Sequence, residues 1–411
     1  MSAEHSDILV VGGGFAALWT AAAAALRRAE LDTELSISLI APGQDMVVRP
    51  RLYEPRPSEM RVPVGRFLEP IGVSHLQATV EAIDVHEREI VAVCGDGTRF
   101  RSRYGRLVVA AGSRLVRNDD LPGAVHLHDV DTMPAAVALD QHLHCLPSRP
   151  MSRGRYTAVV IGAGFVGLEL ATELVTRLQL IAAPHCGARD VRVVLVERSP
   201  VVGPELGPGP RAVIEDALDD LGVDVRLETT VTALDDSLVQ LSDGTVLPAQ
   251  TVVWAAGMKA SPIVRSVPGH RDSLDRLEVD RFFRVLGVDG VFAAGDTASI
   301  EVAPGHRAPQ ACQYAHQMGK HAGHNAVCDL LDLPLVEFMP EPYVTCLDLG
   351  AAGAVYTEGF DRAVRATGAS AKRIKRHINQ ELIYPPLDDA VEILRRADYL
   401  AARAPSANVI V

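Results

Sequence analysis

The stretch that decides the fold is residues 158–169, AVVIGAGFVGLE. It begins with a run of apolar residues that is typical of a buried strand, and it continues after the glycines with residues that favour a helix. Between strand and helix lies G-x-G-x-x-G, whose first glycine permits a tight turn and whose second lets a phosphate approach the backbone. The third glycine lets the helix pack closely on the strand. The stretch therefore predicts a dinucleotide site formed by Gly162, Gly164, Phe165, Val166 and Gly167.

The same pattern occurs at the start of the chain. Residues 7–11, DILVV, form an apolar strand that runs into GGGFAA at residues 12–17. This is G-x-G-x-x-A, in which an alanine is the small residue that faces the strand. We expect a second dinucleotide site formed by Gly12, Gly14, Phe15, Ala16 and Ala17.

Each phosphate loop opens a longer unit with the same order of elements. After the first loop we expect strands at 80–84, 89–93 and 99–101, and then a separate buried strand at 107–112. The second unit closes with TVVWAAG at 251–257, so both units end in Ala-Ala-Gly. Gly12 and Gly112 are 100 positions apart, and Gly162 and Gly257 are 95 positions apart. This internal repeat predicts an α/β protein with two Rossmann-like dinucleotide-binding domains. Because both units end in the same way, we also expect cofactor contacts at the strand ends, from Ala111, Gly112 and Gly257.

The residue that follows the second strand of such a unit selects the ribose. In the later unit this residue is Glu197, which ends the strand at 191–196. A carboxylate accepts hydrogen bonds from both ribose hydroxyls and repels a 2′-phosphate, which favours NADH over NADPH. The adjacent Arg198 could instead accept that phosphate. In the first unit the position is Ala41, so the group that binds the ribose there is not assigned.

A third stretch, residues 291–317, is VFAAGDTASIEVAPGHRAPQACQYAHQ. It begins as a buried strand and breaks at Gly295 and Asp296. A small-residue turn suits a backbone that approaches a ligand, and the carboxylate accepts hydrogen bonds from hydroxyls. A helix is expected from about Pro309 onwards.

Several segments resemble parts of known flavoproteins. GVFAAGD at 290–296 resembles the second flavin fingerprint of flavoproteins with two dinucleotide domains, whose Asp binds the ribityl and pyrophosphate region of FAD. CQYAHQ at 312–317, RPRLYE at 49–54 and WAAGMKASP at 254–262 resemble segments of the type II NADH dehydrogenases. The chain is therefore identified as a type II NADH dehydrogenase-like member of the pyridine nucleotide-disulfide oxidoreductase superfamily that lacks the close cysteine pair of the disulfide reductases.

The resemblance implies an activity and two cofactors. FAD would bind at the first loop and Asp296, and NADH would bind at the second loop and pass a hydride to the flavin. Electrons would then go to a quinone-like acceptor beside Gln313 and Gln317, which are four positions apart and share one helix face. The alternative is that these glutamines are exposed and bind only water.

The resemblance also implies roles for charged residues near the flavin. The segment with Arg49 and Arg51 would lie along the isoalloxazine ring, and Glu169 would lie near the nicotinamide and orient its carboxamide. Arg51 stands where the family has a leucine. It could favour an anionic reduced flavin or an acidic substrate, or it could be a solvated loop residue.

The order of motifs predicts three domains. Residues 1–120 and 263–335 would form a discontinuous FAD-binding domain, because the third stretch returns to complete the first site. Residues 121–262 would form the NAD(P)H-binding domain, and 336–411 a small C-terminal α+β domain with a hairpin of strands 343–349 and 352–357.

The C-terminal residues contain two charged or amphipathic segments. Residues 362–376 include six basic residues and no acid, and they could contact anionic lipid weakly or form a solvated face. Residues 387–404 are expected to form an amphipathic helix for packing or for a homodimer interface.

Composition narrows the partners and the compartment. The net charge of −12 disfavours a nucleic-acid binder, because contact with phosphates needs a basic face. The first strand begins by Asp7 and no run of 18 apolar residues lacks a charge or a breaker, so we expect a cytoplasmic protein, peripheral at most at the inner membrane face. His126, His128, His142 and His144 have no fixed carboxylate partner, so surface positions are expected for them and no metal site is predicted.

Three other functions remain open from the sequence. The first is an FAD-dependent oxidase or tailoring enzyme for a small acidic metabolite, which Arg51 and the missing acid at Ala41 favour. The second is a sulfide:quinone reductase, for which Cys346 could serve, although Cys145 and Cys186 do not lie in the expected contexts. The third is a flavoprotein that senses NADH without being an enzyme.

Overall fold

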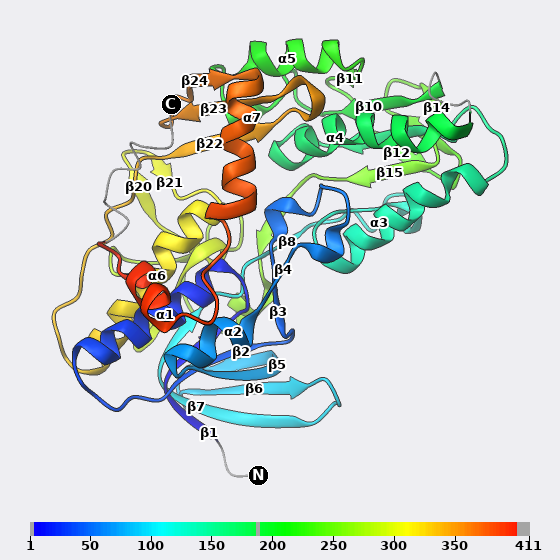
Figure 1. Cartoon of the computed structure of the whole chain (residues 1–411). Coiled ribbons are helices and arrows are strands. Elements are labelled where there is room, and N and C mark those ends of the chain that lie inside the picture. The colour runs from blue at the N-terminus through cyan, green and yellow to red at the C-terminus, as the bar shows by residue number, and fades with distance from the viewer. Residues whose placement is uncertain (1–3, 186–189, 401–411) are drawn as a thin grey trace.

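The first sheet carries the N-terminal phosphate loop. The computed structural model describes residues 4–185 and 190–400 (Figure 1). Five strands pair in parallel in the order β5-β2-β1-β7-β18. They are β1 (Glu4–Val11), β2 (Ile37–Ala41), β5 (Ser74–Asp84), β7 (Arg99–Val109) and β18 (Val291–Ala293). The strand order reverses between β1 and β7, and ligands of such sheets bind at this point, outside the carboxyl ends of the strands.

The strands after the first loop are longer than the sequence predicts. β6 (Glu89–Cys94) pairs antiparallel with both β5 and β7, which gives the expected meander. The two strands predicted at 99–101 and 107–112 are one continuous strand, β7, so that prediction was wrong. The reason is Gly105, where an added Cβ would lie 2.7 Å from the Asp7 carbonyl oxygen. This glycine permits the close approach of β1 and does not break the strand.

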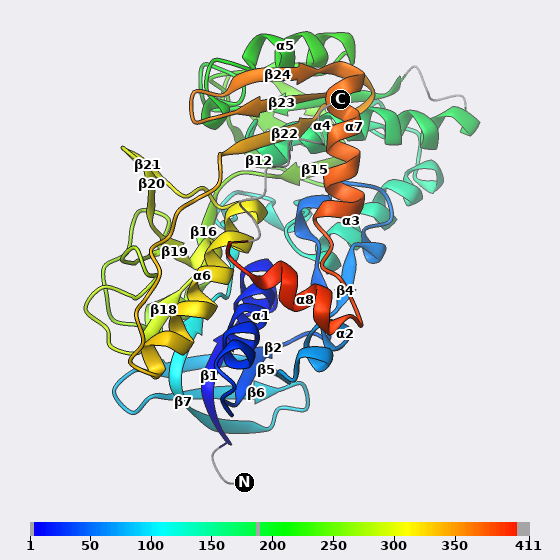
Figure 2. The same ribbon diagram turned by 60° about the vertical axis from the view of Figure 1, so that its left-hand side comes forward.

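The second sheet carries the other phosphate loop. Its strands pair in parallel in the order β11-β10-β9-β15, and this order also reverses beside the loop, between β9 and β15. They are β9 (Thr157–Ile161), β10 (Arg192–Val196), β11 (Asp224–Arg226) and β15 (Thr251–Trp254). A ribbon of β8 (Ser113–Leu115) and β16 (Met258–Ala260) lies between the two sheets; Figure 1 labels β8 and Figure 2 labels β16. The predicted α/β fold with two dinucleotide-binding sheets is confirmed.

Helices and small sheets cover these strands. The helices of the two units are α1 (Phe15–Glu30), α2 (Val64–Leu68), α3 (Met133–Cys145), α4 (Phe165–Ala182) and α5 (Arg211–Asp220). The shorter strands are β3 (Asp45–Val47), β4 (Arg61–Pro63), β12 (Val231–Leu234), β13 (Leu238–Leu241), β14 (Val246–Pro248), β17 (Leu277–Glu278), β19 (Ala298–Ser299), β20 (Glu301–Ala303) and β21 (His306–Arg307).

α6 (Cys312–Leu330) packs along α1, as both views show (Figures 1 and 2). Two glycines of α6 make this close packing possible. An added Cβ on Gly319 would lie 2.4 Å from the Ala16 carbonyl oxygen, and one on Gly323 would lie 2.1 Å from the Thr20 carbonyl oxygen. The helix begins three residues later than the predicted Pro309, since Ala311 is still extended.

The C-terminal residues form a sheet that one helix covers. The predicted hairpin is a three-stranded antiparallel sheet of β22 (Val344–Asp348), β23 (Ala354–Glu358) and β24 (Ala363–Thr367), followed by α7 (Gly368–His377). The basic segment is therefore a strand and then a helix. Two of its cations, Lys372 and Lys375, pair with buried carboxylates of the chain.

The last described helix, α8 (Ala390–Ala397), contacts α1 (Figure 2). Its Ile393 is fully buried, so at least part of the predicted amphipathic face packs within the chain. Residues 401–404 of the predicted helix lie outside the described residues, as does Cys186. Among the helices that the structure describes, none combines the length and the apolar character that crossing a membrane needs.

The four histidines of the connector do not all lie at the surface. His126 and His144 are exposed, as predicted. The rings of His128 and His142 are half-buried with their centroids 4.3 Å apart, and His142 Nε2 lies 2.9 Å from the Thr251 hydroxyl. Burial lowers the pKa of both, that of His142 to about 4, so this pair is neutral packing between α3 and the second sheet.

Candidate active site

One cavity of about 2110 Å³ lies between the two phosphate loops. It brings together most of the residues that the sequence singles out. Those that line it are Gly12, Gly14, Phe15, Ala16, Arg49, Ala111, Gly112, Gly162, Gly164, Phe165, Val166, Glu169, Glu197, Gly257, Asp296, Gln313 and Gln317. The predicted site residues that do not line it are Ala17, Gly167, Gly295 and Arg51.

The small residues outside the cavity wall hold the loops in place. A Cβ on Gly167 would lie 1.8 Å from the Gly162 carbonyl oxygen, so this glycine lets α4 pack on its own loop. A Cβ on Gly295 would lie 2.7 Å from the Ala16 Cβ. Both glycines therefore set the shape of a loop without needing to touch a ligand.

The first phosphate loop is open. Gly12 has φ +135, and a Cβ there would lie 2.1 Å from the Ala110 carbonyl oxygen, so only glycine fits. Gly14 is the N-cap of α1, and an added Cβ would meet no atom within 4 Å. No side chain of the described residues accepts the Phe15 amide and the first turn carries no acid, so this end of α1 can bind a phosphate.

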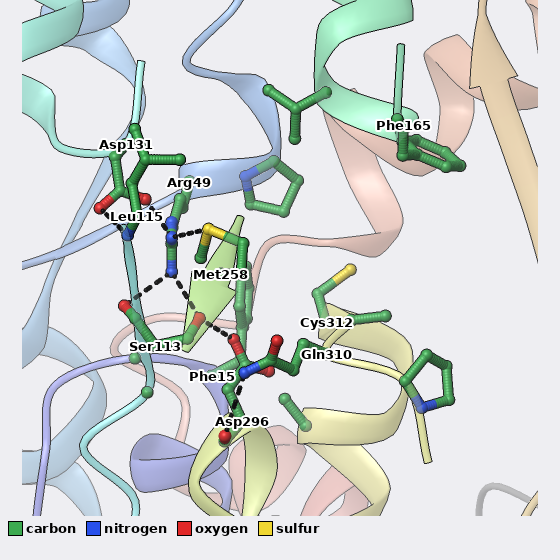
Figure 3. Close-up of a pocket in the computed structure, with 18 of the residues that line it drawn as sticks. Phe15, Arg49, Ser113, Leu115, Asp131, Phe165, Met258, Asp296, Gln310 and Cys312 are labelled. Atoms are coloured by element: carbon green, nitrogen blue, oxygen red, sulfur yellow. Dashed lines mark hydrogen bonds and ion pairs between the residues drawn. The ribbon is translucent and has the colours of Figure 1, made fainter. Parts of the chain in front are cut away.

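A polar network joins Arg49 to Asp296 beneath this loop (Figure 3). Arg49 forms an ion pair with Asp131, and its Nη1 donates to the Ser113 carbonyl oxygen and hydroxyl, both at 3.0 Å. The Ser113 hydroxyl in turn donates to Asp296 Oδ2 at 2.5 Å. Burial raises the pKa of Asp296, although the hydrogen bond from Ser113 opposes the shift. The sequence identified Arg49 and Asp296 but not Ser113 or Asp131, which join them.

In the second unit, Glu197, the acidic residue expected to bind the ribose, also holds the phosphate loop. Glu197 Oε2 accepts the Ala163 amide at 2.7 Å, and Oε1 accepts the Ser199 amide at 2.8 Å. The carboxylate is buried on the cavity wall. Each oxygen keeps a lone pair for a hydroxyl, which is compatible with the role expected for it.

A charged pair on the cavity wall joins two distant segments. Glu169 on α4 and Lys375 on α7 are both buried, with Oε1 and Nζ 2.7 Å apart. Burial raises the pKa of Glu169 to about 7, and the nearby Lys375 cation opposes this shift. Burial by itself would lower the pKa of Lys375, but Glu169 raises it overall. The pair is therefore a buried acid and base in direct contact on the cavity wall.

Further polar groups surround this pair. The Asp348 amide donates to Glu169 Oε1 at 3.0 Å, and the Asp348 carboxylate pairs with Lys372 and accepts the Tyr53 hydroxyl at 3.2 Å. Tyr53 lies in the RPRLYE segment and Lys375 in the basic run, but sequence reasoning did not connect them with Glu169 or Asp348, because no motif links these residues. The sequence did contain one signal for Lys375. Residues 362–376 are basic, include no acid, and have apolar residues at helical spacing.

The two glutamines of α6 are not solvated side chains. Gln313 donates to the Pro342 carbonyl oxygen at 3.1 Å, and its Oε1 lies 3.4 Å from the Val344 amide, so it holds the approach to β22. Gln317 Oε1 accepts the Glu341 amide at 2.8 Å. Within residues 4–185 and 190–400 the buried Gln317 Nε2 has no hydrogen-bond partner, and neither does His316 Nε2 beside it. Both nitrogens belong to residues that line the cavity.

Arg51 does not act in the cavity as the sequence suggested. Its guanidinium forms a two-pronged contact with Glu54, with nitrogen–oxygen distances of 2.9 and 2.6 Å, and it donates to the Tyr384 hydroxyl at 2.8 Å. These hydrogen bonds to the Glu54 carboxylate raise the pKa of Arg51 above its usual range. Arg51 is therefore neither a cation that lines the cavity nor a solvated loop residue. It joins the loop after β3 to Tyr384 in the C-terminal segment.

Two cysteines line the cavity as thiols. They are Cys312 at the start of α6 and Cys346 in β22. Burial raises the pKa of both, that of Cys346 to about 12. Reactive cysteines need a lowered pKa, so these side chains are poor nucleophiles and do not favour a sulfide-oxidising site.

Comparisons with known proteins agree with this geometry. Residues 6–319 match the pyridine nucleotide-disulphide oxidoreductase family. An NADH dehydrogenase-like protein of Mycobacterium tuberculosis is 43% identical over 402 residues, which are 97% of this chain and 98% of that protein. A demethylphylloquinone reductase of Synechocystis is 29% identical over 370 residues, 86% of this chain and 87% of that protein. A type II NADH:quinone oxidoreductase of M. tuberculosis is 30% identical over 328 residues, 72% of this chain and 68% of that protein.

Solved structures share the fold. The NDH2 of Plasmodium falciparum superimposes with a TM-score of 0.77 at 12% identity and covers all of both chains. The sulfide:quinone oxidoreductase of Aquifex aeolicus has a TM-score of 0.73 at 19% identity and covers 98% of this chain and 94% of its own. The chain therefore belongs to the pyridine nucleotide-disulphide oxidoreductase family, in which it is an NADH dehydrogenase-like oxidoreductase.

Proposed function

We propose that this protein binds FAD and NADH, oxidises NADH and passes the electrons to a quinone-like acceptor. The observation that carries the proposal is that both phosphate loops, the Glu169–Lys375 pair and the unpartnered Gln317 amide share one cavity wall. Relatives whose names state demethylphylloquinone reductase and NADH:quinone oxidoreductase support the acceptor class. The proposed domains are 1–120 with 263–335 for FAD, 121–262 for NADH, and 336–411.

The residues present fit a flavin dinucleotide. The open loop at Gly12 and Gly14 suits a pyrophosphate, because the first amides of α1 and the positive end of its dipole face an anion. Asp296 Oδ2 accepts a hydrogen bond from Ser113, while Oδ1 accepts none from the described residues and is therefore available to a ribityl hydroxyl. A bound flavin would supply the chemistry of accepting a hydride and releasing electrons, and the protein supplies position and electric field.

The residues of the chain then have distinct tasks. Glu197 selects the ribose of NADH, and its charge disfavours the 2′-phosphate of NADPH. Glu169, neutral for part of the time at pH 7, holds a proton within the water-poor wall, and Lys375 stabilises its anionic form. Gln317 Nε2 donates a hydrogen bond to a carbonyl oxygen of the acceptor, which gives this buried amide the partner that it lacks.

An anaerobic visible spectrum tests the proposal. A flavin absorption band that NADH bleaches and a soluble short-chain quinone restores is the expected result. NADPH should bleach the band more slowly at equal concentration because of Glu197. A flavin band that NADH leaves unchanged would contradict the proposal. The alternative of an oxidase for a small acid loses its main support, because Arg51 is neutralised by Glu54 and does not line the cavity.

A further inference from the structure

Glu205 lies over the second phosphate loop. It belongs to the segment that follows β10, in a single helical turn, Pro204–Leu206, that begins after the left-handed Gly203. Its Oε1 accepts the amide of Phe165, the first residue of α4, at 2.7 Å. A Cβ on Gly164 would lie 2.9 Å from the same oxygen, so the carboxylate lies directly against the loop.

This amide is one that a dinucleotide needs. The first amides of a helix have no partner within the helix, and together with the helix dipole they form the seat for a pyrophosphate. A carboxylate is also an anion, and it satisfies the same amide through a charge-assisted hydrogen bond. The pyrophosphate and the Glu205 carboxylate therefore compete for one position, and at close range they repel each other.

The two phosphate loops of the chain differ in this respect. In the first loop an added Cβ at Gly14 meets no atom within 4 Å, whereas at Gly164 it would meet the Glu205 carboxylate. Among the described residues no side chain accepts the Phe15 amide, whereas Glu205 accepts the equivalent amide of Phe165. The loop proposed for the flavin is open, and the loop proposed for NADH is covered.

The carboxylate can leave without unfolding its segment. Glu205 is exposed, and the hydrogen bond from the Phe165 amide is the one that its carboxylate accepts among the described residues. The backbone around it is fixed separately, since the Gly203 amide donates to the Ala163 carbonyl oxygen at 3.1 Å and Leu206 is buried. Rotation of one side chain into solvent is therefore enough to free the Phe165 amide.

We propose that Glu205 is an internal competitor of the dinucleotide: its carboxylate occupies the pyrophosphate seat of the free protein and is displaced when NADH binds. The free energy needed to break this contact is subtracted from the binding free energy of both NADH and NAD⁺. The oxidised product is therefore bound less tightly and is released faster. This inference rests on the proposed binding of NADH at the Gly162 loop.

Calorimetric titration of the flavin-loaded protein with ADP-ribose tests the inference without any redox reaction. ADP-ribose carries the pyrophosphate, and adenosine, which lacks it, is the control ligand. For Glu205→Gln we expect ADP-ribose to bind about three- to tenfold tighter, with adenosine unchanged. Glu205→Asp keeps the charge on a shorter side chain and should also bind tighter if contact with the amide is what competes.

A matched variant separates the possible explanations. Glu215→Gln removes an exposed acid of α5 in the same unit and should leave the dissociation constant of ADP-ribose unchanged. If Glu205 is only a helix cap, Glu205→Gln will leave ADP-ribose binding equal or weaker, which overturns the inference. If the unaltered protein binds neither ADP-ribose nor NADH, the proposed function fails instead.

Discussion

At the scale of single residues, Glu169 is the group whose ionisation the structure sets most clearly. Its pKa is raised from 4.5 to about 7 by burial, so the protonated fraction falls as pH rises through 7. By linkage, the stability that this residue contributes is complete below pH 4.5 and is lost as pH rises through 7. If the carboxyl supplies a proton to the acceptor, the rate of quinone reduction should decline above about pH 7.

The pH–rate profile of two variants checks this. Glu169→Gln should lower the rate about 10- to 100-fold and remove the decline, as expected for loss of one general acid. Lys375→Met should move the decline to higher pH, because the lysine cation lowers the pKa of Glu169. Glu173→Gln is the control: burial raises the pKa of Glu173 to about 6, but it lies off the cavity wall. A decline that persists in Glu169→Gln would assign the titration to another group.

At the scale of elements, the packing of α6 on α1 positions Gln313 and Gln317 relative to the first phosphate loop. Gly323→Ala would place a Cβ 2.1 Å from the Thr20 carbonyl oxygen, which forces the helices apart. Overpacking of this kind costs about 1–3 kcal/mol, more than the roughly 0.5–1 kcal/mol that alanine adds to a helix. We expect a lower denaturation midpoint and a lower ratio of bound flavin to protein.

Gly95→Ala is the matched control for this substitution. It lies in the turn between β6 and β7, where an added Cβ meets no atom within 4 Å and φ is not in the left-handed region. Its midpoint and flavin content should equal those of the unaltered protein. If Gly323→Ala is as stable as this control, the helix contact does not depend on the glycine.

At the scale of the whole molecule, one polar network joins three segments of the chain. Tyr53 from the first unit donates to Asp348 of β22, whose amide reaches Glu169 of the second unit. Tyr53→Phe removes a hydrogen bond worth about 1 kcal/mol, so the amides of α7 should exchange about fivefold faster with deuterium. Tyr356→Phe, in the same C-terminal sheet, removes a hydroxyl with no hydrogen-bond partner among the described residues and should leave the exchange rate unchanged.

The sequence by itself determined the two parallel sheets, their phosphate loops and the acid after β10. Each of these depends on neighbouring residues, because a glycine turn, a buried strand and a helix start are local features of the backbone. The same reasoning gave Gln313 and Gln317 one helix face. It predicted two strands where β7 is continuous, since the approach of another strand at Gly105 is not visible in a local pattern.

Only the tertiary structure decided which charges meet. Lys375 appears in the sequence as one cation in a basic run, and it becomes the buried partner of Glu169 because α7 packs beside α4. Arg51 forms hydrogen bonds with Glu54 and Tyr384 and does not line the cavity. Glu205, which the sequence did not single out, accepts a hydrogen bond from the second phosphate loop. The physical reason is that ionisation and hydrogen bonding depend on burial and on distances of about 3 Å between residues far apart in the chain, which spacing along the sequence does not encode.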